Sequence, residues 1–263
     1  MKKTVLFFML FAALLSSFSL PAQAQAMRHQ WYCKHVKDHV QPPLDARLSF
    51  IEEHNAYYID RRHADANDGD KVIYLTFDAG YENGNIAKTL DILRDENVSA
   101  AFFILDTMLY KNEELVERMI KEGHTVANHT ARHKDMSQYA SDAFLAELGS
   151  LETLYRERTG QEMAKYYRPP EGVFSRENLI CAAENGYKTI FWSFAYPDWD
   201  NQKQMPLEKA KGIILDNLHN GEVMLLHPTS DTNVQILADV IREARAQGYR
   251  FGTLDELTGA NGQ

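Results

Sequence analysis

The sequence has few cysteines and no surplus of basic residues. Only two cysteines, Cys33 and Cys181, occur among 263 residues, too few for the disulfide framework of small exported domains. They could pair with each other or remain unrelated thiols. The 28 Lys and Arg residues are outnumbered by 37 Asp and Glu, which gives a formal net charge of -9. This acidic balance argues against a nucleic-acid partner.

Long apolar runs are also missing, except at the N-terminus. Two lysines precede an apolar run over residues 4–20, and a stretch of small residues follows it. This order is typical of a secretory signal peptide. We expect residues 1–26 to be a signal peptide that is cleaved after Ala24 or Ala26, so that the protein is secreted or retained in the cell envelope without stable membrane insertion. An uncleaved membrane anchor is the alternative.

About 240 residues then remain, which is within the range of one large α/β domain. Residues 27–70 are polar and are interrupted by Pro42 and Pro43, and we interpret them as an N-terminal extension that packs on the main domain and holds one helix within residues 48–58. The catalytic domain is expected over residues 71–258, with a tail at 259–263. We expect a monomer.

From residue 71 onward, short apolar segments alternate with segments of helical periodicity. Apolar runs without alternation indicate strands that are buried on both faces. Glycines end four of the expected helices, and short connections of this kind predict parallel strands with right-handed crossovers. Strands are expected at 72–77, 100–105, 125–127, 165–168, 189–194, 223–226 and 249–251, and helices at 85–96, 113–121, 142–158, 176–184, 207–218 and 234–246.

Polar residues follow five of these strands. In a β/α barrel the carboxyl ends of all strands face one cavity, whereas an open sheet spreads them along an edge. Each residue alone also fits an ordinary surface or core position, but their equivalent placement favours a distorted (β/α) barrel of about seven parallel strands. The residues are Asp78, His129 with His133, Arg168 to Pro170, Asp198 with Trp199, and His227.

The two histidines of the second group are four residues apart. On one face of a helical turn at the end of a strand, His129 and His133 would converge on a single cation. The spacing alone also fits a solvated helix face, so this prediction depends on the groups that the barrel would bring to the same cavity.

Together these segments resemble a known family. Their order is that of the polysaccharide deacetylase family, also called the NodB-homology or carbohydrate esterase 4 family, and the resemblance runs from about residue 72 to 257. More narrowly, residues 41–43, 76–84 and 191–199 resemble the sporulation-type branch that makes muramic δ-lactam. The resemblance implies a hydrolase that removes acetyl groups from N-acetylmuramic acid in peptidoglycan glycan strands.

The chemistry of acetamide hydrolysis is consistent with this resemblance. The reaction needs a polarised carbonyl, an activated water and a protonated amine leaving group. A divalent cation, with zinc as the expected metal, would be held by His129 and His133 and would serve the first two needs. The resemblance implies that Asp78 is the general base and that Arg168 pairs with it.

The remaining roles also follow from the resemblance. His227 would be the general acid, with Asp198 favouring its charged form. The backbone N–H of Glu171, directly after Pro170, would lie at the oxyanion position. Trp199 and Leu225 would line the floor under the acetyl methyl group.

The sequence departs from the family pattern at two positions. The third metal ligand is usually an Asp directly after the base, but Ala79 stands there and cannot coordinate a cation. Metal affinity is then expected to be low unless water, Glu82 or another side chain completes the site. Glu171 replaces an aromatic residue. Two alternatives stay open: a deacetylase of N-acetylglucosamine in peptidoglycan or chitin-like oligomers, and a non-catalytic glycan-binding protein with a degenerate metal site.

Overall fold

The computed structural model describes residues 26–65 and 69–259. The expected signal peptide, apart from Ala26, lies outside the described residues, and so does the expected tail after Gly259. In the described ranges, no helix is long and apolar enough to cross a membrane. The thiols of Cys33 and Cys181 are both free.

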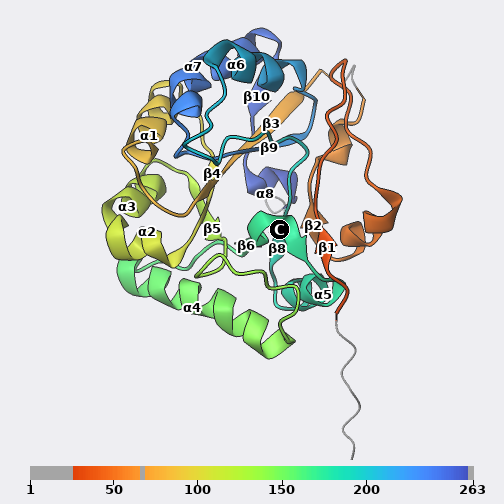
Figure 1. The fold of residues 1–263 in the computed structure, drawn as a ribbon, viewed down its shortest axis with the longest axis vertical. Helices are drawn as coiled ribbons and strands as arrows, with labels where there is room; N and C mark the ends of the chain where they lie inside the picture. The colour runs from red at the N-terminus through yellow and green to blue at the C-terminus, as the bar shows by residue number, and fades with distance from the viewer. Residues whose placement is uncertain (1–25, 66–68, 260–263) are drawn as a thin grey trace, which may run out of the picture.

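A curled sheet of eight parallel-paired strands forms the centre of the protein (Figure 1). Its order is β10–β3–β4–β5–β6–β8–β2, and β9 pairs with β3. An isolated bridge between Phe194 and Met224 joins the β8 side to β9, so the sheet curls towards closure. Seven of the strands are those expected from the sequence, which confirms the distorted barrel. The strands are β2 (Ala56–Tyr57), β3 (Lys71–Ala79), β4 (Ala101–Ile104), β5 (Thr125–Asn128), β6 (Tyr166–Tyr167), β8 (Lys188–Ile190), β9 (Glu222–Leu226) and β10 (Tyr249–Phe251).

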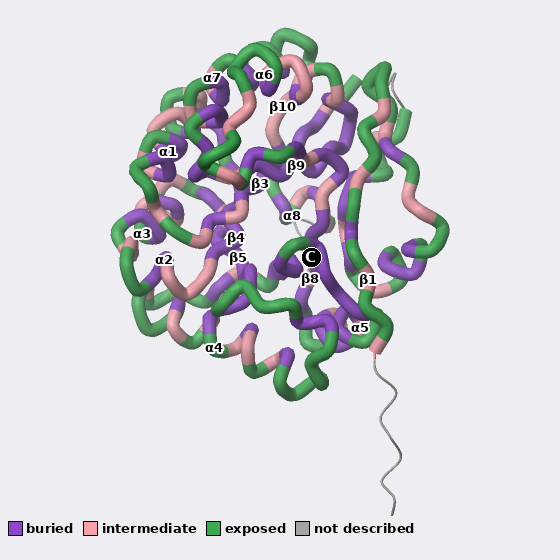
Figure 2. The backbone as a smooth tube through the Cα atoms, in the orientation of Figure 1, coloured by how far each residue is buried: buried purple, intermediate pink, exposed green. Residues whose placement is uncertain are grey.

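Helices cover the outside of this sheet (Figure 1). The strand interiors are buried, and the helices alternate buried and exposed residues along their length (Figure 2). This pattern is expected when an amphipathic helix buries one face against a sheet. All six expected helices are present. The helices are α1 (Ile86–Asp95), α2 (Asp106–Lys111), α3 (Glu113–Lys121), α4 (Ser141–Thr159), α5 (Arg176–Glu184), α6 (Leu207–Asp216), α7 (Asp231–Ala246) and α8 (Leu254–Leu257), of which α2 and α8 were not anticipated.

The helix expected within residues 48–58 is wrong. The chain there forms the 3₁₀ helix η1 (Ala46–Glu53) and then the strand β2. Asn55 adopts a left-handed conformation with φ 49°, which ends the helical run, and its carbonyl accepts a hydrogen bond from Thr189 N–H at 2.9 Å. Pairing with β8 therefore overrides the apolar helical spacing.

Further upstream, the chain adds a short second sheet. Strand β1 (His29–Gln30) pairs antiparallel with β7 (Val173–Phe174), which follows the 3₁₀ turn η3 (Pro170–Gly172). Residues from the beginning of the described chain thus lie beside a loop that is more than a hundred residues away in sequence.

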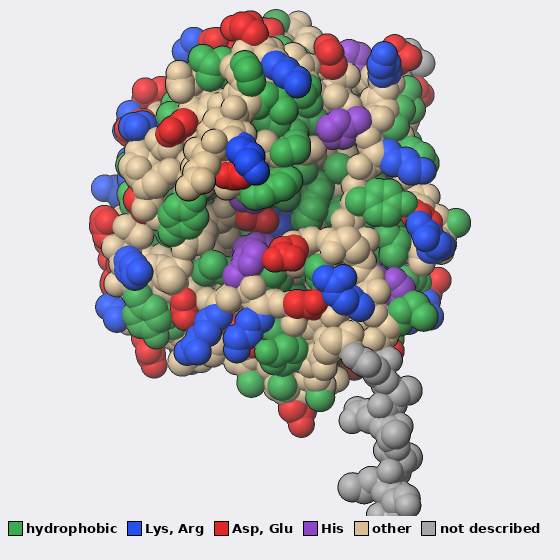
Figure 3. Space-filling view, viewed as in Figure 1, with side chains coloured by type: hydrophobic (Ala, Val, Ile, Leu, Met, Phe, Trp, Pro, Cys, Tyr) green, Lys and Arg blue, Asp and Glu red, His purple; other side chains and the backbone are tan. Residues whose placement is uncertain are grey.

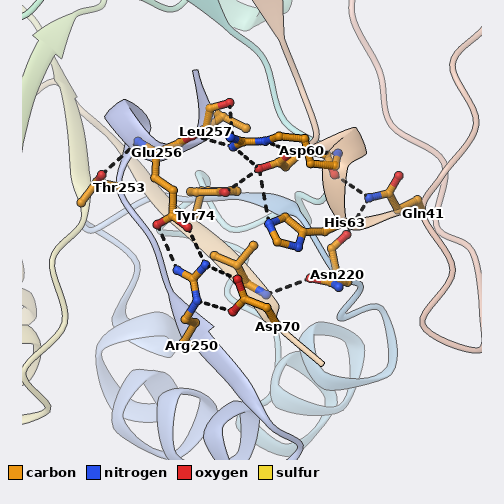
Figure 4. Close-up of polar contacts among 12 residues, drawn as sticks. Gln41, Asp60, His63, Asp70, Tyr74, Asn220, Arg250, Thr253, Glu256 and Leu257 are labelled. Carbon is orange, nitrogen blue, oxygen red and sulfur yellow. Dashed lines mark hydrogen bonds and ion pairs between the residues drawn. The ribbon is translucent and has the colours of Figure 1, made fainter. Parts of the chain in front are cut away.

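A polar network ties the chain together at the amino ends of the strands (Figure 4). Asp60 accepts hydrogen bonds from Tyr74 Oη at 2.7 Å and from the Arg62 guanidinium at 2.6 and 2.9 Å. Beside it, Arg250 bridges the carboxylates of Asp70 and Glu256. This network connects the N-terminal region to β3, β10 and α8 at the end of the barrel opposite the cavity described next.

Candidate active site

A cavity of about 680 Å³ opens at the carboxyl ends of the strands. Histidine, acidic and hydrophobic side chains gather in a hollow on this face of the molecule (Figure 3). Seven of the ten site residues expected from the sequence line the cavity, and Arg168 and Asp198 contact two of those seven. Its lining consists of Asp78, Gly80, Tyr81, Leu105, His129, His133, Glu171, Trp192, Ala195, Tyr196, Trp199, Leu225, His227 and Thr229.

Asp78 lies at the end of β3 and pairs with a fully buried arginine. Arg168 Nη1 donates to Asp78 Oδ1 at 2.9 Å, and the guanidinium also donates to Thr76 Oγ1 at 2.9 Å and to the Ile190 carbonyl at 3.0 Å. Arg168 is 0% exposed. Burial alone would raise the pKa of Asp78, but the neighbouring His129 and Arg168 outweigh it and hold that pKa below its usual value. Asp78 is therefore ionised and fixed in orientation at neutral pH.

The guanidinium of Arg168 also packs on an aromatic ring. Its guanidinium carbon lies 4.1 Å from the centroid of the Phe103 ring. Burial lowers the pKa of Arg168, and the carboxylate of Asp78 partly offsets this. Because both partners are withdrawn from water, removing either one would leave an uncompensated buried charge.

The two histidines converge, although the helical turn expected to bring them together is absent. Residues 129–140 form a loop and α4 begins only at Ser141. Left-handed backbone at Thr130 (φ 66°) and His133 (φ 53°) turns the chain back on itself. The ring centroids of His129 and His133 are 5.0 Å apart. A loop with two left-handed residues therefore does what the helix was expected to do.

His129 is prepared to act as a metal ligand. Its Nδ1 donates to the Arg168 carbonyl at 2.9 Å, which leaves the Nε2 lone pair free, 3.5 Å from Asp78 Oδ2. Burial lowers the pKa of His129 to about 4, so the ring is neutral at pH 7. A neutral imidazole whose other nitrogen is hydrogen-bonded to a carbonyl is the usual state of a metal-binding histidine.

The residues at the cavity that could hold a divalent cation are His129 and His133, with Asp78 beside them. Ala79 is buried and contributes no donor. Glu82 accepts a hydrogen bond from the Ile86 N–H at 3.0 Å, at the start of α1, so its carboxylate is engaged there. Among residues 26–65 and 69–259, no group of three or more His, Cys, Asp or Glu side chains forms a complete metal site.

A second charged pair contributes to the cavity from the other side of β3. Asp198 Oδ1 contacts His227 Nδ1 at 2.7 Å, and Asp198 Oδ2 accepts from the His227 N–H at 2.8 Å. Burial alone would lower the pKa of His227, but the charge and hydrogen bond of Asp198 outweigh it and raise that pKa. His227 therefore keeps its proton to a higher pH than a free histidine and directs Nε2 away from Asp198.

The loop after Arg168 places Glu171 at the cavity and Pro170 outside its lining. Glu171 has φ 56° and ψ 9°, a left-handed conformation, and Gly172 follows with φ 68°. In the part of the chain that the structure describes, no acceptor takes a hydrogen bond from the Glu171 N–H. Pro170 is buried and contributes by directing the turn.

The two apolar residues expected in the cavity differ in their exposure. Leu225 is 4% exposed and lines the cavity. Trp199 is 61% exposed and contacts His227 edge-on with a centroid distance of 6.3 Å. Trp199 therefore lines the cavity at its exposed rim, where its ring could stack on a sugar.

Several residues at the cavity were not anticipated from the sequence. Tyr81 is 51% exposed at the rim, and its hydroxyl accepts from Asn201 Nδ2 at 2.8 Å. Asn233, at the start of α7, donates to Asp198 Oδ2 at 2.6 Å. Tyr81 lies within residues 76–84, the stretch that resembles the δ-lactam branch, and this resemblance could have identified it as a site residue. Nothing local distinguishes Asn233 from any polar residue in the first turn of a helix.

Comparison with known families gives a match that agrees with this geometry. The model of the family described as "Polysaccharide deacetylase" matches residues 65–190. This segment includes Asp78, His129, His133 and Arg168, whereas Asp198 and His227 lie beyond it.

Similar proteins extend over nearly the whole chain. The sequence is 36% identical over 240 residues to the peptidoglycan-N-acetylmuramic acid deacetylase PdaA of Bacillus subtilis, a match that covers 90% of this chain and 89% of that protein. A solved structure of Bacillus subtilis PdaA, described as a family 4 carbohydrate esterase, superimposes with a TM-score of 0.82 at 35% identity and covers 89% of this chain and 98% of the other. A peptidoglycan-N-acetylglucosamine deacetylase of Bacillus cereus is 30% identical over 193 residues, which covers 72% of this chain and 88% of that protein.

Proposed function

We propose that this chain, which belongs to the polysaccharide deacetylase family and is a hydrolase of amide bonds, removes the acetyl group from N-acetylmuramic acid in peptidoglycan. The observation that carries the proposal is the presence of two charged pairs at one cavity. Asp78–Arg168 supplies an ionised carboxylate, and Asp198–His227 supplies an imidazole whose charged form Asp198 favours. Amide hydrolysis needs one group that accepts a proton and another that donates one.

The choice of sugar rests on similarity. The relative that matches at 36% identity over 90% of this chain is named for N-acetylmuramic acid, and the one named for N-acetylglucosamine covers 72% of the chain. Removal of this acetyl group is the step that frees the amine needed for a muramic δ-lactam. The acidic chain would work at the cell envelope, where its substrate lies, after export by the N-terminal segment.

We propose that His129 and His133 bind a divalent cation and that this cation is zinc. When bound, it supplies Lewis-acid polarisation of the acetamide carbonyl and activation of a water. The hydrogen bond from His129 Nδ1 to the Arg168 carbonyl holds the ring in the tautomer that a ligand needs. Because Ala79 adds no donor, we expect the site to hold the cation loosely.

The proton transfers are assigned to the two charged pairs. Asp78 takes a proton from the attacking water, and Arg168 holds the carboxylate in place and ionised. His227 donates its proton to the nitrogen of the departing amine, and Asp198 keeps His227 charged until that moment. The Glu171 N–H, which has no acceptor among the described residues, donates to the oxyanion that develops on the acetamide oxygen.

The direct test is acetate release from purified peptidoglycan. The full chain is freed of metal with a chelator and assayed with and without added zinc. We expect acetate release that rises at least tenfold with zinc. Equal and near-zero release in both samples, on intact strands and on strands whose stem peptides have been removed, would contradict the proposed function.

The second candidate substrate is N-acetylglucosamine in the same glycan strands. The Bacillus cereus relative supports it. Mass spectrometry of muropeptides after digestion separates the two cases, because one acetyl mass is lost from one sugar or from the other. Loss from glucosamine alone would replace the muramic acid assignment while leaving the amide hydrolase intact.

A further inference from the structure

The N-terminal strand β1 lies directly against the loop that carries Glu171. Gln30 Nε2 donates to the Glu171 carbonyl, and Trp31 N–H donates to the Gly172 carbonyl at 2.8 Å. These contacts join residues that are 141 positions apart. Both hydrogen bonds therefore end on the turn η3. The Glu171 N–H in this turn has no acceptor among the described residues.

Trp31 anchors this strand in the core. It is 4% exposed, and its ring stacks on Phe191 with centroids 4.6 Å apart. Its indole Nε1 donates to the Trp192 carbonyl at 3.0 Å, and Trp192 lines the cavity. The contacts of Trp31 therefore fix strand β1 relative to the cavity independently of the hydrogen bond between Gln30 and the loop.

The loop fits closely against this anchor. A Cβ on Gly172 would approach Trp31 Cβ and the Trp192 ring at 2.9 Å each. Only a glycine allows the backbone to pass this close with φ 68°. The Gly172 N–H donates to the Pro169 carbonyl at 3.0 Å, so the peptide between Glu171 and Gly172 is held at its N–H by Pro169 and at its carbonyl by Gln30.

This restraint matters because Glu171 is strained. A left-handed conformation costs a residue with a Cβ about 1–2 kcal/mol, and such strain persists only where surrounding contacts over-determine it. Without the Gln30 hydrogen bond, the peptide after Glu171 can rotate towards an ordinary conformation. Leaving φ 56° is a rotation about the bond between the Glu171 nitrogen and its Cα. It changes the angle between the released peptide and the Pro170–Glu171 peptide, so the direction of the Glu171 N–H within the loop changes with it.

We propose that Gln30 is a positioning residue for the reaction, which holds the strained Glu171 turn so that its N–H points at the developing oxyanion. This inference rests on the proposed function. It makes the N-terminal region part of the active site, even though no atom of Gln30 lines the cavity.

The test uses four variants of the full chain. Gln30→Ala removes the donor, Gln30→Glu replaces it with an acceptor of the same size, and Gln30→Lys restores a donor. Gln138→Ala is the matched control, because Gln138 Nε2 donates at 3.0 Å to the Ala26 carbonyl in the same N-terminal segment without touching the loop. We measure kcat and KM for acetate release, and backbone hydrogen exchange of the peptide over residues 168–176.

The expected result is a split between the two kinetic constants. An oxyanion donor acts in the transition state and not in substrate binding, so kcat falls about tenfold in Gln30→Ala and Gln30→Glu while KM stays within about twofold. Gln30→Lys recovers most of kcat and Gln138→Ala behaves as wild type. Hydrogen exchange over 168–176 quickens in the first two variants only.

Two outcomes would overturn the inference. One is an unchanged kcat in Gln30→Ala, or a rise of KM with kcat intact. The other is an equal loss in Gln138→Ala, which would mean that the segment as a whole stabilises the fold. If the wild type releases no acetate from any glycan, the proposed function fails. Hydrogen exchange then decides the positioning role alone, since faster exchange in Gln30→Ala supports it and unchanged exchange refutes it.

Discussion

The two ends of the barrel both carry charged pairs, but they use them differently. At the amino ends of the strands, Asp60 accepts hydrogen bonds from Arg62 and Tyr74, and Arg250 joins Asp70 to Glu256. At the carboxyl ends, Asp78 and His227 each have one paired face and one face at a cavity of about 680 Å³.

This difference separates stability from chemistry. A carboxylate whose lone pairs are all engaged by protein donors can hold segments together but cannot take a proton from a substrate. A group that is fixed on one side and open on the other is oriented for reaction and still has capacity for it. Four changes, ordered by expected effect, test whether the two ends are distinct in this way.

The largest effect is expected from Asp78→Asn at the cavity. The amide cannot act as a general base, so kcat should fall about 10³-fold, which corresponds to about 4 kcal/mol. Acetate release by the purified variant measures this loss. Asp106→Asn, at the start of α2 and outside the cavity lining, is the control and should keep wild-type activity. If Asp78→Asn replaced the wild-type protein in the cell without any loss of its biological activity, the protein would be one that only binds glycans.

Asp198→Asn should change the pH dependence as well as the rate. The charge of Asp198 raises the pKa of His227, and the general acid works only while protonated. Losing that charge lowers the pKa of His227, so the alkaline fall of kcat/KM should move to lower pH, with a rate loss of about 30-fold at neutral pH.

The pH profile of acetate release between pH 5 and 10 shows this shift. Asp200→Asn is a control in the same loop, because the Asp200 side chain is 43% exposed, lies 3.8 Å from Lys203 and accepts a hydrogen bond only from the nearby Gln202 N–H. An alkaline limb that stays in place in Asp198→Asn would mean that His227 is not the group that titrates.

Asp60→Asn tests the opposite end of the barrel. The variant leaves Tyr74 and Arg62 without their charged acceptor, and the free energy of unfolding should fall by about 2 kcal/mol, which lowers Tm by about 4–8 °C. The value of kcat/KM per folded molecule should not change. Burial alone would raise the pKa of Asp60, but the hydrogen bonds from Arg62 and Tyr74 outweigh it and lower that pKa. This contribution is therefore lost as the pH falls through the folded pKa, and the destabilisation should shrink in acid.

Asp45→Asn is a matched control for this change. Asp45 binds Arg47 with the same two-residue spacing and the same pattern of backbone and guanidinium hydrogen bonds, but Arg47 is 81% exposed. Such an exposed pair is screened by solvent and contributes little to stability. Equal destabilisation by both variants would show that burial adds nothing at Asp60, and a loss of kcat/KM in Asp60→Asn would break the separation of the two ends.

The smallest effect is expected at Glu222, the first residue of β9. It is 0% exposed, and its Oε1 has no hydrogen-bond partner. Burial raises the pKa of Glu222 well above its usual value, against a weaker opposing hydrogen bond from the His219 N–H. The folded state holds this proton more tightly than the unfolded chain, so the stability it contributes is lost as the pH rises.

Glu222→Gln should remove that pH dependence. We expect a Tm that exceeds the wild-type value by about 2–4 °C at pH 8, the shift produced by about 1 kcal/mol in a domain of this size, and an advantage that shrinks towards pH 5. Thermal melts at several pH values measure it. Glu208→Gln, where the side chain is 88% exposed, should show no such trend, and a pH-independent difference at Glu222 would contradict the buried ionisation.

Much of the fold could be predicted because its signals are local. Apolar runs such as residues 72–77 and the glycine-terminated helices identified seven strands and six helices. The helix within residues 48–58 was wrong because the pairing of Ala56 and Tyr57 with β8 is a long-range contact. The convergence of His129 and His133 was anticipated from their spacing on a helical turn. The chain over residues 129–140 is a loop instead, so the helical reason was wrong.

The sequence by itself determined which polar residues gather at the carboxyl ends of the strands. Asp78 lies at the end of its strand, and Arg168, Asp198 and His227 come after theirs. Parallel strands place their carboxyl ends together whatever the detailed packing. Only the tertiary structure decided how those residues are held. Asn233 donates to Asp198, and Gln30 donates to the Glu171 carbonyl. Both are contacts between distant segments that leave no periodic trace in the chain, because they depend on where the elements meet and not on the local sequence of either one.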